Sequence, residues 1–158
     1  TPARVAPVRR DTAETEALLV LIQRPDDIAP LLDEALFGDP VVIAAYRAVV
    51  AGATLADAVA ALGAAGEEHS ADLLQRLAVE DTDAEAGDVL RRLVEEGASR
   101  AISALQAEAR VADDPLAVAG DIAWVKHRML ELREPDTAES ATDQLLGWLT
   151  GQTEESDG

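Results

Sequence analysis

Apolar residues recur every three to four positions along most of the chain, a spacing that places them on one face of an α-helix. In the first segment this face comprises Ala17, Leu18, Leu21 and Ile22. Strict alternation of apolar and polar residues, typical of half-buried β-strands, is nearly absent. The pattern predicts an all-α fold, with helices over 11–24, 25–36, 40–52, 54–63, 66–79, 84–110, 115–134 and 138–150.

Residues that favour helix ends fit these segments. Asp39 before Pro40 combines a capping side chain with proline at the first helical position. Asp11 or Thr12 can cap the first helix, and Glu14 stands where it can pair with Asp11. Whether 25–36 forms one helix or two stays open; its apolar positions are Ile28, Leu31, Leu32 and Ala35.

The C-terminal part has the longest helical pattern and then two shorter helices. Within 115–134 the apolar positions step by four and three, as in a seam between paired helices; they are Val118, Ile122, Val125, Met129 and Leu132. We therefore expect a helical bundle over 11–95 and a long helix with a C-terminal helical hairpin over 96–150. Residues 1–10 are expected to be a linker from upstream domains, and 151–158 a disordered acidic tail.

Charge and composition narrow the function. The 158 residues carry a formal net charge of −18 and include no cysteine. Such a chain repels phosphate backbones and anionic membranes, so we expect no direct binding of nucleic acid and no membrane association. A cytoplasmic, monomeric protein that binds a protein partner is expected.

Three groups of residues in the sequence have the composition of a metal site or a catalytic site. His127 and Glu131 lie four residues apart, as metal ligands do, but only two ligands are visible and a surface ion pair is favoured. His69, Ser70 and Asp72 are too close along one helix to form a catalytic triad. The acidic run 81–88 resembles a calcium loop without its final glutamate. We expect no catalytic residue, metal or other cofactor in this chain.

Trp124 stands apart from the Val118–Leu132 seam and close to Arg128 and Glu131. Tryptophan and arginine on a polar face are typical of interface anchors. The alternative, that Trp124 packs on the last helix or on the long one, stays open. Trp148 lies on the apolar face of its own helix, where core packing is favoured.

Several of these residues occur in an order that resembles a known family. The run 17–26, Ala-Leu-Leu-Val-Leu-Ile-Gln-Arg-Pro-Asp, is similar to the opening of the C-terminal helicase-binding domain of bacterial DNA primase. The similarity continues through Phe37 with Tyr46-Arg47, through 73–77 followed by Glu80-Asp81, and through the long helix that ends near Arg110. The N-terminal domain of the replicative helicase shares the pattern and is the alternative within this fold.

The resemblance implies a protein–protein interaction domain that docks primase on the replicative DNA helicase during replication priming. In the family the C-terminal hairpin makes the main grip, which implies seven helicase-binding residues here. These are Trp124, Arg128, Glu131, Leu132, Leu145, Trp148 and Leu149. A second implied site would bind the C-terminal tail of single-stranded-DNA-binding protein at Arg9, Arg10 and Leu18.

The resemblance also implies that primer synthesis takes place elsewhere. In the family the DNA-directed RNA polymerase centre, a nucleotidyltransferase, lies upstream with its zinc module and Mg²⁺. We therefore expect this chain itself to have no enzymatic activity. From a different class, a small all-α enzyme or metal-dependent regulator is the alternative.

Overall fold

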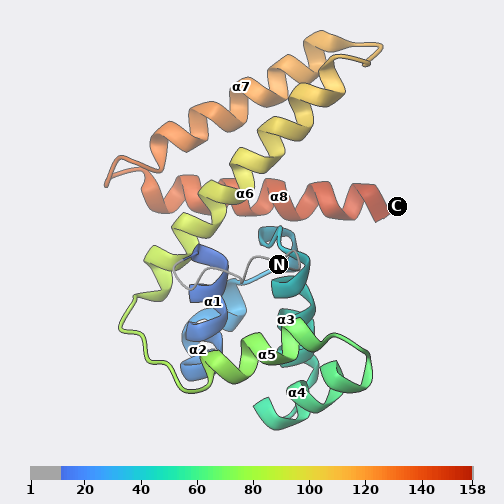
Figure 1. The fold of residues 1–158 in the computed structure, drawn as a ribbon. Coiled ribbons are helices and arrows are strands. Elements are labelled where there is room, and N and C mark those ends of the chain that lie inside the picture. The colour runs from blue at the N-terminus through green and yellow to red at the C-terminus, as the bar shows by residue number, and fades with distance from the viewer. Residues whose placement is uncertain (1–11, 158) are drawn as a thin grey trace, which may run out of the picture. The chain divides into compact units, whose positions relative to one another are not determined.

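A computed structural model describes residues 12–157, and the side chains within residues 12–151. The all-α expectation is confirmed, since this part of the chain contains α-helices and 3₁₀-helices and no strand. The helices are α1 (Ala13–Gln23), α2 (Pro25–Ile28), η1 (Ala29–Leu31), η2 (Glu34–Leu36), α3 (Pro40–Ala51), α4 (Leu55–Ala64), α5 (Glu68–Leu77), α6 (Ala86–Ala109), α7 (Pro115–Glu131) and α8 (Ala138–Asp157) (Figure 1).

The chain divides into two compact units. Unit 1 comprises the described residues up to Glu34 together with Asp39–Val89, and unit 2 comprises Ala35–Gly38 together with the chain from Leu90 onward. The division therefore falls between Val89 and Leu90, earlier than the expected boundary between 95 and 96. The loop 35–38 counts with unit 2, where Arg100 donates a hydrogen bond from Nη2 to the Leu36 carbonyl at 2.9 Å.

Unit 1 is built on α1, α3, α4 and α5, which pack on one another. α1 contributes a nearly continuous apolar run to the core, and Ala17, Leu18 and Val20 have no exposed surface. The buried Ser70 hydroxyl in α5 donates to the Val41 carbonyl of α3 at 2.8 Å. This buried polar group is satisfied, so it joins two helices without a desolvation penalty.

Polar side chains start the helices where the sequence predicts them. Thr12 accepts from the Thr15 amide at 3.2 Å, Asp39 from the Val41 amide at 2.9 Å and Thr54 from the Asp57 amide at 3.1 Å. Each bond satisfies one backbone donor that the first turn leaves without a helical partner. The predicted pairing of Glu14 with Asp11 involves a residue outside the described part.

For residues 25–36, where one helix or two stayed open, the structure has shorter pieces. The segment consists of α2 and the two 3₁₀ turns η1 and η2, because Pro30 has no amide hydrogen and its ring obstructs a continuing α-helix. Ile28 and Leu32 are still buried, whereas Leu31 is exposed. The apolar spacing alone could not reveal this break.

Unit 2 contains most of α6 and the helices α7 and α8. The last helix was predicted to end at 150, and α8 extends to Asp157. Within residues 12–157 no helix has the length and apolar character needed to cross a membrane.

Candidate functional site: the α7–α8 hairpin

α7 and α8 are in contact, and the buried positions of each lie on the apolar face that the sequence predicts. From α7 and the residue that caps it, the buried side chains are Val118, Val125 and Leu132. From α8 the buried apolar side chains include Ala141, Leu145 and Leu149. Ile122 and Met129 of the predicted seam are half-buried. The hairpin is thus held by a small apolar core, and its flanks are left for polar and aromatic groups.

Trp124 lies against Trp148 of α8. Its ring centroid lies 6.1 Å from that of Trp148, with the rings tilted by 38°. The Arg128 guanidinium carbon lies 5.5 Å from the centroid of the Trp124 ring, within the range of a cation–π contact. Both indoles remain half-exposed, so Trp148 is less buried than its apolar face predicted.

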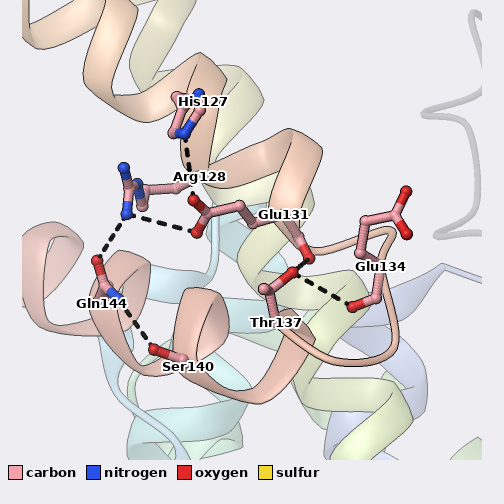
Figure 2. A network of polar contacts seen from close by, with 7 residues as sticks. All are labelled: His127, Arg128, Glu131, Glu134, Thr137, Ser140 and Gln144. Atoms are coloured by element: carbon pink, nitrogen blue, oxygen red, sulfur yellow. Dashed lines mark hydrogen bonds and ion pairs between the residues drawn. The ribbon is translucent and has the colours of Figure 1, made fainter.

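Arg128 is also the centre of a polar network between the helices (Figure 2). Its Nη1 lies 3.4 Å from Glu131 Oε2 and donates to Gln144 Oε1 of α8 at 3.2 Å. Gln144 in turn donates from Nε2 to the Ser140 hydroxyl at 3.0 Å. The guanidinium is therefore fixed over the indole by partners from both helices.

The connection between α7 and α8 is secured by Thr137. Its hydroxyl donates to the Glu131 carbonyl at 2.8 Å, which satisfies one of the backbone acceptors left free at the end of α7 (Figure 2). The sequence reading missed Thr137, Ser140 and Gln144. For Ser140 and Gln144, the only indication in the sequence was their spacing of four residues, which places them on one face of a helix.

The side chains of His127 and Glu131 contact each other, as their spacing favours. His127 Nε2 lies 3.2 Å from Glu131 Oε1, and Figure 2 shows the imidazole directed at the carboxylate that Arg128 also contacts. Among the side chains described, those within residues 12–151, no group of three or more metal-ligating residues is positioned to hold a metal ion.

In unit 1, the glutamine and arginine of the 17–26 motif hold the acidic connector between α5 and α6. Gln23 donates from Nε2 to the Glu80 carbonyl and accepts from the Thr82 amide at 3.4 Å. Arg24 donates from Nη2 to the Ala84 carbonyl. The connector that resembles a calcium loop is thus tied by its backbone to the end of α1.

Tyr46 and Arg47, which also carry the resemblance, contact the segment after α2. The Tyr46 hydroxyl donates to the Leu32 carbonyl at 3.5 Å, and Arg47 pairs with Glu34. Partial burial raises the pKa of Tyr46, and the nearby charges of Asp33 and Glu34 raise it further. These contacts give the motif a structural role in unit 1.

The structure separates the predicted site residues into two groups. Trp124, Arg128, Glu131 and Trp148 gather between α7 and α8 with part of their surface exposed. The buried members are Leu132, Leu145, Leu149 and, in unit 1, Leu18. Burial gives the three hairpin leucines contacts within the core. Arg9 and Arg10 lie outside the described residues.

Comparison with known proteins adds no identification. No model of a protein family matches the chain, and no curated protein or solved structure is significantly similar to it.

Proposed function

We propose that this chain docks a bacterial DNA primase on the replicative DNA helicase, with the α7–α8 hairpin as the grip. The observation that supports the proposal most is the cluster of Trp124, Arg128 and Trp148. Tryptophan and arginine are enriched among residues that dominate binding energies, and here both types keep part of their surface exposed. The resemblance in 17–26 and the following motifs supplies the identity of the partner.

The contacts within the cluster support this proposal. Arg128 is held by Glu131 and Gln144, and Trp124 is held by Trp148. A partner that covers preordered side chains loses less conformational entropy than one that must order them first. Burial in a complex would also strengthen the cation–π contact by removing water from it.

The test measures binding of the full chain to the purified replicative helicase of the same organism. Trp124→Ala and Arg128→Met are each expected to weaken binding at least tenfold, while Arg47→Met in unit 1 should not change it. Circular dichroism of each variant checks that the helices remain. The proposal fails if the wild-type chain does not bind, or if both hairpin variants bind like wild type.

Gel filtration of the chain alone measures its oligomeric state and is an independent test. A monomer is expected for the docking domain of a primase. A hexameric ring would instead support the N-terminal domain of the helicase. A rise in melting temperature on addition of a divalent metal would support the metal-dependent alternative.

A further inference from the structure

α7 has a second stripe on the face opposite its buried seam. The members of this stripe follow one another at intervals of four, three, four and three residues, as the members of the Val118–Leu132 seam do. Each member stands two positions before the corresponding residue of that seam. The members are Leu116, Gly120, Ala123, His127 and Leu130, named here the outer stripe. Two positions correspond to about 200° around an α-helix, so the buried seam and the outer stripe lie back to back.

Every member of the outer stripe is exposed. Leu116 is 84% exposed and Leu130 is 62% exposed, which places a large apolar side chain near each end. Between them the helix rises about 21 Å, or some four turns. Single exposed leucines are ordinary on a protein surface. Two exposed leucines at positions that follow the spacing of a helix–helix seam indicate a face on which another helix can pack.

The middle of the outer stripe is shallow. Gly120 and Ala123 have the smallest side chains, and no atom lies within 4 Å of the position that a Gly120 side chain would occupy. Small residues let two helix axes approach to about 8 Å. The complementary surface is therefore an amphipathic helix with large apolar residues opposite Gly120 and Ala123.

The charges around the outer stripe indicate which kind of helix can bind to it. Lys126, the only lysine in a chain of net charge −18, is exposed along one border of the outer stripe, and His127 lies within it. A helix with acidic residues on its flank would meet this basic border favourably. A second copy of the chain would bring together two bodies of charge −18, and an anionic membrane would also repel the chain.

The geometry points to the outer stripe of α7 as a docking face for an amphipathic helix with an acidic flank, supplied by a different protein. On the proposed function, on which this inference rests, that protein is the replicative helicase. Trp124 borders the outer stripe on the side opposite Lys126, about 100° from Ala123 around the helix. The helix of the partner would thus lie along α7 beside the tryptophan cluster.

The test introduces a charged, longer side chain at the centre of the outer stripe. Ala123→Glu keeps a good helix former at an exposed position, so the hairpin should stay folded. Binding to the replicative helicase should weaken at least tenfold. The matched control is Ala60→Glu, the same change at an exposed position in α4 of unit 1.

The charge argument has its own pair of variants. Lys126→Glu should weaken binding several-fold and make it less sensitive to salt, whereas Lys126→Arg should preserve both. If the wild-type chain binds the helicase and both Ala123→Glu and Lys126→Glu bind equally well, the outer stripe is excluded while the proposed function stands. If the wild-type chain does not bind, both ideas fail. Concentration-dependent dimers of the wild type that Ala123→Glu abolishes would identify a second copy as the occupant and overturn this proposal.

Discussion

Replacing Gln23 with alanine tests whether the motif residue has the structural role that its contacts indicate. The amide side chain bonds two backbone groups of the connector, the Glu80 carbonyl and the Thr82 amide. These groups lie 57 and 59 residues away along the chain, so the bonds close a long loop. Alanine removes both bonds and leaves a partly buried carbonyl and amide without their side-chain partners.

A typical intramolecular hydrogen bond contributes about 1 kcal/mol, and a buried group left unsatisfied costs about 1–3 kcal/mol. Water reaches part of this connector, since Thr82 is half-buried and Asp81 and Asp83 are exposed. We therefore expect Gln23→Ala to lower the free energy of unfolding of unit 1 by about 1–3 kcal/mol. For a unit of this size, each 1 kcal/mol lowers the melting temperature by about 4–8 °C.

Two measurements check this expectation. Urea unfolding followed by far-ultraviolet circular dichroism gives the loss of stability, and hydrogen exchange of 80–84 gives the local effect. The matched control is Gln75→Ala, an exposed glutamine of α5, which should change stability by at most about 0.5 kcal/mol. Equal stability and equal exchange in the two variants would refute the role of Gln23 as the anchor of the connector.

Two further predictions concern the core and pH. Leu145→Ala should destabilise unit 2 by about 2–5 kcal/mol, because the side chain is fully buried in the hairpin. Unfolding followed by the fluorescence of Trp124 and Trp148, both in unit 2, measures this loss of stability. The control Leu146→Ala, at a half-buried position, should lower the free energy of unfolding clearly less. The pKa of Tyr46 is raised by partial burial and then by Asp33 and Glu34. The resulting stabilisation is fully present below the unfolded pKa of about 10 and is lost as pH rises through the higher folded pKa. Near-ultraviolet titration of this single tyrosine should show the raised pKa, and Tyr46→Phe should remove this part of the alkaline loss of stability; an ordinary pKa would contradict the prediction.

Local chemistry explains why much of the fold could be predicted. Thr12, Asp39 and Thr54 cap their helices through bonds to amides two or three residues away, so the sequence contains both partners. The seam through Val118, Val125 and Leu132 likewise follows from helical spacing. At 25–36 the same spacing left one helix or two open, because Pro30 breaks the backbone pattern whatever the apolar positions favour.

Contacts between distant residues could not be predicted in this way. Glu14 is a capping candidate for its own helix, yet its carboxylate accepts from the Asp39 amide at 3.0 Å. Gln144 gave no signal as a site residue until the hairpin placed it against Arg128. Helical periodicity states which face of a helix is apolar, but it does not state which helix covers that face.

The amino-acid sequence alone determined the helical class, the helix starts and the inward face of α7, because caps and periodicity act within a few residues of each other. Only the tertiary structure decided that Trp124 meets Trp148 under Arg128, and that Gln23 holds the connector before α6. These contacts depend on how separate helices pack, and many pairings are compatible with the same apolar stripe. The outer stripe depends on both the sequence and the tertiary structure. Its spacing follows from the sequence, whereas its exposure depends on which helix faces the fold leaves uncovered.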